Sequence, residues 1–212
     1  MRPVNQFTPD LVRYAAPVLK LNGQNTTHCG VIYRPVEAGP LFFLHFAEHL
    51  DLRVDALDPT YFFEDFALDE SDCKFVAANC GAIALRNPKI PYGFSFRGVS
   101  FDPTSGDIRL ADPDSALTCA TFVLVLLETS GFALLIYDEW TPGVNDEWAL
   151  NHIKRIEEKG ADKKYLRRLR STLGTVARFR PEEVVGACPV VPWPVGFEAA
   201  SEAADRLLQQ LR

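Results

Sequence analysis

Cys119 is the residue of this chain whose surroundings best favour a reactive thiol. It opens the apolar run 117–127, and Gly131 just beyond that run can end a helix. Asp114 and Ser115, just before the run, are residue types that cap helix N-termini. We therefore expect the thiol on the first turn of a buried helix, where unpaired N–H groups and the helix dipole favour the nucleophilic thiolate. The alternative is an inert cysteine packed in the core.

Two histidines lie on a predicted β-hairpin upstream of this cysteine. The segment 27–34 has strand character, 35–40 is rich in turn residues, and 41–47 is an apolar and aromatic returning strand. His28 is near the start of the hairpin and His45 near its end, so antiparallel pairing should bring them together. One imidazole could accept the thiol proton, and the second polar group could hold the first in the required tautomer.

Three features in this order carry a family resemblance. They are the motif His-x-Gly-Val-Ile-Tyr at 28–33, an apolar strand that ends in His45, and the distant Cys119 that opens a helix. This order resembles the circularly permuted papain-like hydrolases, the NlpC-type superfamily with its lecithin–retinol acyltransferase branch. The resemblance covers roughly residues 25–130, a length that suits one small domain. It implies an α+β fold in which an antiparallel sheet packs on the helix that carries the nucleophile.

The resemblance also implies roles for individual residues. It makes Cys119 the nucleophile, His28 the base and His45 the residue that orients the base. The implied activity is a cysteine hydrolase or acyltransferase that forms a thioacyl intermediate on a peptide, amide or other acyl substrate, without cofactor or metal. Thr118 and Gly30 are the candidate oxyanion- or substrate-binding residues. Gly30 would let a substrate approach closely, and Thr118 replaces the Asn or Tyr that usually precedes the cysteine. Because of Thr118 and a longer, proline-flanked hairpin turn, the substrate class and the further oxyanion donors stay open.

Other functions would use the same residues differently. A non-catalytic papain-like module would keep the hairpin and the helix and bind a partner in the pocket. A thiol redox protein would pair Cys119 with another of the five cysteines, although the sequence has no Cys-x-x-Cys motif. A zinc site at His28, His45 and His49 is a further alternative, since imidazole suits zinc, but a strand-to-loop segment gives the last two no helical spacing.

Polar neighbours of these residues have simpler explanations. Cys29 follows His28 on a strand, so its side chain is expected on the opposite face and is a poor nucleophile for that histidine. Glu48 could orient His45, but the surface is the preferred place for it. His152 lies in a charged segment and is expected to be solvated.

The composition suits one globular domain, or one domain with a helical extension. The chain has 212 residues, of which 47% are hydrophobic, and a net charge of −6. That charge argues against a nucleic-acid-binding protein, which is usually basic. The basic stretch 163–170 is expected to be the solvated face of a helix, with a phosphate or membrane-surface patch as the alternative.

We expect neither a secretory signal nor an integral membrane segment. Residues 1–6 contain no apolar stretch, and the longest apolar run is shorter than the roughly 20 residues that span a bilayer. The expected location is therefore the cytoplasm, with export that uses no cleaved signal left open. The oligomeric state has no signature in the sequence.

The remaining patterns predict an α+β core at residues 1–140 and a helical C-terminal extension at 141–212. This extension could cover the site, bind a partner or complete the core. Besides the hairpin, the patterns predict strands at 50–54, 92–101 and 108–110, and helices at 9–16, 69–85, 145–159, 162–172, 181–187 and 198–211.

Overall fold

An antiparallel sheet forms the centre of the molecule. The computed structural model describes residues 2–3, 12, 14–22, 26–37, 39–57, 60–144, 146–158 and 160–211. The strand order of the main sheet is β1–β6–β2–β3–β4–β5, and all paired neighbours are antiparallel. Its strands are β1 (Arg2–Pro3), β2 (Ala15–Asn22), β3 (Thr26–Tyr33), β4 (Phe42–Glu48), β5 (Asp51–Asp55) and β6 (Tyr61–Phe63).

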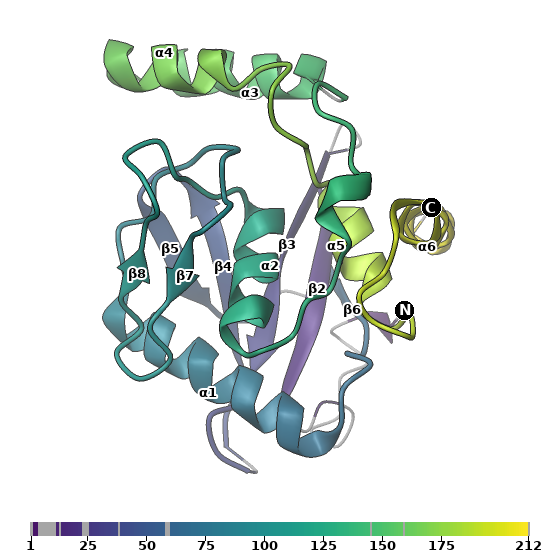
Figure 1. Ribbon diagram of the computed structural model, residues 1–212. Helices are drawn as coiled ribbons and strands as arrows, with labels where there is room; N and C mark the ends of the chain where they lie inside the picture. Colours follow the sequence, from purple (N-terminus) through teal and green to yellow (C-terminus); the bar gives the residue numbers. More distant parts are fainter. Residues whose placement is uncertain are drawn as a thin grey trace.

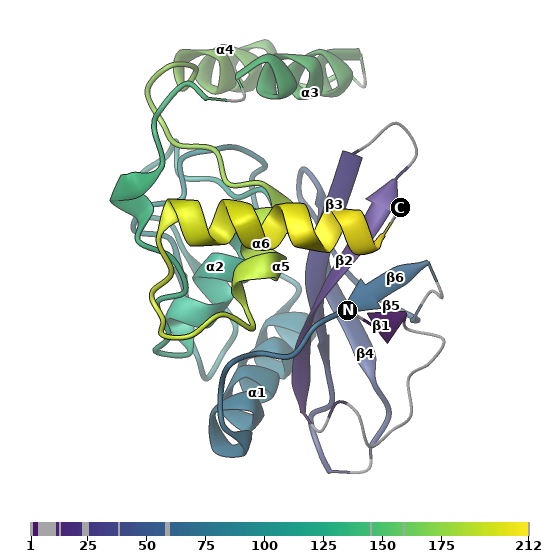
Figure 2. The same ribbon diagram turned by 90° about the vertical axis from the view of Figure 1, so that its right-hand side faces the viewer.

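Helices cover one face of this sheet. Figures 1 and 2 show α1, α2 and α5 on that face, α6 packed outside α5, and the pair α3 and α4 standing apart at one end. A small second sheet, β7 (Ser100–Phe101) with β8 (Ile108–Arg109), lies beside α2. The helices are α1 (Glu70–Arg86), α2 (Cys119–Thr129), α3 (Asp146–Glu158), α4 (Lys163–Ser171), α5 (Pro181–Ala187) and α6 (Phe197–Gln210). The fold is therefore mixed α+β, as expected.

Strand alternation divides the apolar residues between two clusters. On β3 and β4, Cys29, Val31 and Leu44 face the helices and join the large core. Ile32 and Phe43 face the other side, where they pack with residues of β2 and β6 in a smaller cluster. The sheet is thus apolar on both faces, and Cys29 lies on the side of α2.

The helices predicted from residue 69 onward are confirmed with nearly the same bounds. The clearest case is α1, where the Asp69 side chain accepts a hydrogen bond from the N–H of Asp72, and Asn87 ends the helix in the left-handed conformation. Among the residues described, no helix has both the length and the apolar composition to cross a membrane.

The helix predicted at 9–16 is wrong for its last two residues. Ala15 and Ala16 belong to β2, where they pair with Tyr33 and Ile32 of β3. The good helix propensity of alanine is overridden here by pairing within a buried sheet. Of residues 9–14, only 12 and 14 lie among the described residues.

The strand predicted at 92–101 is also largely wrong. Only Ser100 and Phe101 form a strand, and Tyr92 makes a single parallel bridge to Leu117. The alternating aromatic side chains of Tyr92, Phe94 and Phe96 are buried, but they belong to an irregular loop and not to a paired strand. Gly98, with a φ of +73°, interrupts the extended backbone.

The C-terminal helices have two different positions. Val184, Val185 and Cys188 belong to the same core as the sheet and α2, so α5 completes that core. The buried Glu182 of α5 accepts a hydrogen bond of 2.6 Å from the Thr27 hydroxyl, next to His28 on β3. By contrast, α3 and α4 extend away from the sheet (Figure 2). A domain boundary at residue 140 stays a prediction.

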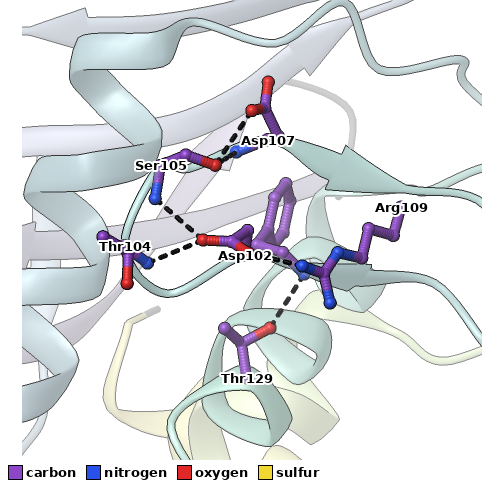
Figure 3. A network of polar contacts seen from close by, with 7 residues as sticks. Asp102, Thr104, Ser105, Asp107, Arg109 and Thr129 are labelled. Carbon is purple, nitrogen blue, oxygen red and sulfur yellow. Dashed lines mark hydrogen bonds and ion pairs between the residues drawn. The ribbon is translucent and has the colours of Figure 1, made fainter.

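A polar network closes the turn between β7 and β8 (Figure 3). The Asp102 carboxylate accepts hydrogen bonds from the N–H groups of Thr104 at 3.0 Å and Ser105 at 2.9 Å, and it pairs with Arg109. These hydrogen bonds hold the pKa of Asp102 below its ordinary value. Thr129 accepts a hydrogen bond of 3.1 Å from the N–H of Phe101, which ties the hairpin to the end of α2.

The same turn packs closely on α1 at Gly106. Gly106 has a φ of +71°, and a Cβ there would lie 2.2 Å from the carbonyl oxygen of Ala82. Gly131, after α2, also has a positive φ of +89°, but a Cβ there would have no neighbour within 4 Å. A comparison of substitutions at these two glycines therefore distinguishes the cost of backbone strain from the cost of steric overlap.

Gly106→Ala should lower the free energy of unfolding more than Gly131→Ala. Each change places alanine in the left-handed region, at a cost of about 1–2 kcal/mol. Only Gly106→Ala adds overlap with the α1 backbone, so its loss should be larger by about 1–3 kcal/mol. Urea unfolding of both variants measures the difference, and equal losses would contradict the close packing at Gly106.

Candidate active site

Cys119 is the first residue of α2, as the sequence predicted, but the cap is a different residue. The Thr118 hydroxyl accepts a hydrogen bond of 3.2 Å from the N–H of Thr121, and the Thr121 hydroxyl accepts one of 2.7 Å from the N–H of Thr118. This reciprocal capping box leaves the Cys119 N–H on the first turn, where no intrahelical acceptor exists. Thr118, predicted to contact substrate, is buried and its hydroxyl is used in the cap.

The predicted caps Asp114 and Ser115 belong to a turn before the helix. Ser115 Oγ accepts a hydrogen bond of 3.1 Å from the N–H of Asp112. The bridge between Leu117 and Tyr92 then keeps the chain extended beyond that turn. The helix consequently begins a few residues later than those cap residue types indicated.

His28 and His45 meet as expected from hairpin pairing. His28 Nε2 lies 2.8 Å from His45 Nδ1, and the two rings are nearly perpendicular, at 80°. The other nitrogen of His45, Nε2, lies 2.9 Å from Oδ2 of Asp55 at the end of β5. A hydrogen-bonded chain of three side chains therefore runs from Asp55 through His45 to His28.

The direction of the donors in this chain follows from the carboxylate. Since ionised Asp55 can only accept, His45 donates its Nε2–H, and neutral His45 then accepts at Nδ1 from the Nε2–H of His28. Burial lowers the pKa of His45, and the hydrogen bond to Asp55 opposes this shift only in part. This tautomer leaves Nδ1 of His28 as the nitrogen that can accept a proton.

Gly30 makes room for His45. A Cβ on Gly30 would lie 2.6 Å from both the Cβ of His45 and the carbonyl oxygen of Leu44. On its other side, the His45 ring stacks on Phe43, with ring centres 4.5 Å apart. Gly30 is buried and does not line the cavity beside Cys119, so the structure places it behind His45 and not at a substrate surface.

The surroundings of Cys119 favour its thiolate. A hydrogen bond with the Cys29 thiol is the largest influence that holds the pKa of Cys119 well below its ordinary value. Burial opposes this shift, while the charge and hydrogen bond of His28 and a backbone hydrogen bond of Cys29 add to it. Cys29 itself is fully buried, which raises its pKa well above the ordinary value. The negative charge therefore belongs on Cys119.

The strand geometry explains how Cys29 and His28 both reach Cys119. The β3–β4 ladder extends from the pair Tyr33–Phe42 to the pair Val31–Leu44, short of His28. Cys29 faces α2 from the core side, as alternation predicted. Because His28 lies beyond the β3–β4 ladder, its ring can contact both His45 and the N-terminus of α2.

A cavity of about 430 Å³ opens beside the thiol and the imidazole. Residues of α3, of the start of β3 and of the end of β4 line it. This volume is within the range of small-molecule sites. The lining residues are Thr26, Thr27, His28, Phe46, Ala47, Glu48, His49, Tyr92, Cys119, Trp148, His152, Arg155, Ile156, Gly160 and Ala161.

The other two histidines also line the cavity beside Cys119. His49 Nδ1 accepts a hydrogen bond of 3.1 Å from the N–H of Tyr92, and its ring lies 4.3 Å from that of Tyr165. His152, expected to be solvated, stacks on Tyr92 at 4.2 Å and lines the cavity. The described part of the chain contains no group of three His, Cys, Asp or Glu side chains arranged to hold a metal ion.

Sequence reasoning missed two contributors to this site. Asp55 is the last residue of β5, just beyond the strand predicted at 50–54, and its position one strand away from His45 was the signal that could have found it. The residues of α3 had no such signal, because only the packing of the C-terminal part places that helix beside Cys119. Glu48, the residue weighed for the role of Asp55, is exposed at the cavity rim.

Comparison of the chain with protein-family models, with curated proteins and with solved structures gave no match. The chemistry of the site must therefore be argued from its own geometry.

Cys119 should react with iodoacetamide well below the pH at which a free thiol reacts. Only the thiolate is alkylated, so the lowered pKa should move the inflection of the rate below about 8.5. His28→Ala and Cys29→Ala should each move it upward, because each removes an influence that favours the thiolate. Peptide mass spectrometry over a pH series measures this shift.

Cys73 is the control within the same molecule. Burial raises its pKa to about 11, so it should stay almost unmodified at neutral pH. An inflection of Cys119 near the free-thiol value, unchanged by His28→Ala, would contradict the thiolate assignment.

Proposed function

We propose that this protein is a papain-like cysteine hydrolase or acyltransferase with Cys119 as nucleophile and His28 as base. The observation that carries the proposal is the continuous chain from Asp55 through His45 to His28, at 2.9 and 2.8 Å, which ends beside a cysteine of lowered pKa. A nucleophile, a base and a residue that orients the base are the set that acyl transfer requires.

The position of the nucleophile supports the same conclusion. Cys119 begins a buried helix that packs on an antiparallel sheet, which is the arrangement implied by the resemblance to permuted papain-like hydrolases. The helix dipole and the free N–H groups of the first turn stabilise a thiolate there. The sulfur is only partly exposed and lines the cavity, so a substrate can reach it.

The proposed reaction has two steps. The Cys119 thiolate attacks the carbonyl carbon of an amide, ester or thioester, and the carbonyl oxygen takes the negative charge next to the Cys119 N–H. His28, which holds the thiol proton on Nδ1, donates it to the leaving group as the carbon–heteroatom bond breaks. Water or a second acceptor then gives a proton to His28, attacks the thioester carbonyl and releases Cys119.

Within this scheme His45 and Asp55 are positioning residues. His45 accepts from the Nε2–H of His28, which directs Nδ1 of His28 toward the reacting groups. Asp55 fixes the tautomer of His45 through a 2.9 Å hydrogen bond. Because about half of the Asp55 side chain is exposed, at 48%, its electrostatic contribution is moderated by solvent.

An activated acyl ester should acylate Cys119. With p-nitrophenyl acetate, we expect a burst of p-nitrophenolate and an acetylated peptide that contains Cys119, because the thiolate displaces the phenolate. His28→Ala should reduce the burst rate at pH 7 by roughly 100-fold, the usual size of a lost general base. Cys119→Ala, with the same fold by circular dichroism, should abolish it.

Acetylation of other residues with no burst would instead favour the non-catalytic module. In that case the cavity would serve to bind a partner.

Asp55→Asn should slow acylation by roughly tenfold or more, in line with the loss of outer groups that orient a histidine. The asparagine amide can donate to His45 and favour its other tautomer, so that Nδ1 of His45 no longer accepts from His28. Stopped-flow burst rates at pH 7 measure the effect. Asp51→Asn, on the same strand but paired with Arg53, is the matched control and should leave the rate unchanged.

A further inference from the structure

One face of α3 is directed at the candidate site. Trp148, His152, Arg155 and Ile156 follow the spacing of a single helical face, and all four line the cavity that contains Cys119. Side chains from one face of a single helix therefore line the cavity that contains the nucleophile. Its only permanent charge is the guanidinium of Arg155.

Arg155 differs from Arg168 and Arg170 of α4 in its contacts. Arg170 pairs with Glu157 at 2.6 Å, and Arg168 pairs with Asp114 at 3.1 Å. Throughout the described ranges of the chain, no carboxylate lies in ion-pair distance of Arg155. Its guanidinium approaches His152 Nδ1 at 3.3 Å, a contact that supplies no negative charge.

The aromatic residues of the cavity hold this guanidinium in place. The His152 ring stacks with Tyr92, at 4.2 Å and 23°, and with Trp148, at 5.5 Å and 21°. Because Nδ1 of His152 accepts from Arg155, the stack orients the guanidinium along the cavity wall. The charge of Arg155 also acts on Tyr92. Burial raises the pKa of Tyr92 and the charge of Cys119 raises it further, while the charge of Arg155 lowers it.

Glu48 and Arg178 are further charged groups near this cation. Glu48 lines the same cavity from the end of β4. Arg178, whose charge also reaches Tyr92, is paired with Asp146 at 3.0 Å. Arg155 is therefore the positive group from α3 that a ligand in the cavity would meet.

We propose that Arg155 is a specificity-determining residue that binds a carboxylate of the substrate, so that acyl compounds with a carboxylate near the scissile carbonyl are preferred. This inference rests on the proposed function for its use of Cys119. The planar guanidinium suits a carboxylate because two parallel N–H donors can meet its two oxygens. The cavity limits the distance between that carboxylate and the sulfur to the span of one small molecule.

Iodoacetate and iodoacetamide test the inference on the intact protein. Both transfer a CH₂ group to the Cys119 sulfur and release iodide, and they differ in carrying a carboxylate or a neutral amide. The quantity measured is the ratio of the two alkylation rates at Cys119, at low salt and pH 7. Arg155→Gln should lower the iodoacetate-to-iodoacetamide ratio by about threefold or more, as expected for the loss of one charge at this range. Arg155→Lys should retain an intermediate ratio.

Lys154→Gln is the matched control. Lys154 is the neighbour of Arg155 on the same helix, is exposed as Arg155 is, carries the same charge and does not line the cavity. This change alters the net charge as Arg155→Gln does, so an equal fall of the ratio in both variants would overturn the proposal. An unchanged ratio in Arg155→Gln would overturn it as well.

The two proposals fail in different ways. If iodoacetamide reacts with Cys119 no faster than with a free thiol, the proposed nucleophile is wrong, while the ratio still reports on Arg155. If Cys119 is reactive and the ratio does not depend on Arg155, only the carboxylate subsite is wrong. The iodoacetamide rate at Cys119 shows for each variant that its nucleophile is intact. If Arg155→Gln has lost that rate, the ratio measured for Arg155→Lys decides the test.

Discussion

The packing of α2 against β3 is the constraint on which the candidate site depends. Every residue from Ala120 to Leu127 is buried, so the helix can neither rotate nor slide without exposing apolar surface. Its N-terminus is thereby held beside Cys29 and His28. The chemistry of Cys119 thus follows from a hydrophobic constraint, since the same contacts that bury the helix determine where its first residue lies.

The polar chain at the site is supported by apolar neighbours. His45 is buried, stacked on Phe43 and placed against Gly30, so its ring has little freedom to turn. A buried imidazole with both nitrogens paired costs little, whereas an unpaired one would destabilise the sheet. The hydrogen bonds to His28 and Asp55 therefore stabilise the fold and orient the site at once.

The helices of the C-terminal part contribute to both the core and the cavity. The buried helix α5 completes the packing of β3 and α2, and its Glu182 holds Thr27 next to His28. The protruding pair of α3 and α4 adds Ala149, Ile153, Leu166 and Leu169 to the same core, and α3 also lines the cavity. Residues far apart in the sequence therefore meet around one sulfur atom.

The sequence by itself determined the elements that local patterns control. Apolar runs and cap residues identified α1, α2 and the helices after residue 145, and the hairpin pattern placed His28 next to His45. These features depend on neighbours in sequence or on a single turn. The Thr118 cap, in contrast, escaped prediction because a bridge between Leu117 and Tyr92 delays the start of α2.

Only the tertiary structure decided which side chains complete the site. Asp55 reaches His45 because β5 pairs with β4, and Cys29 reaches Cys119 because the core brings β3 against α2. The face of α3 turns toward the cavity because of packing between residues far apart in the sequence, including the stack of His152 on Tyr92. Such contacts arise from the burial of distant apolar surfaces, which leaves no periodic signal in the residues that it brings together.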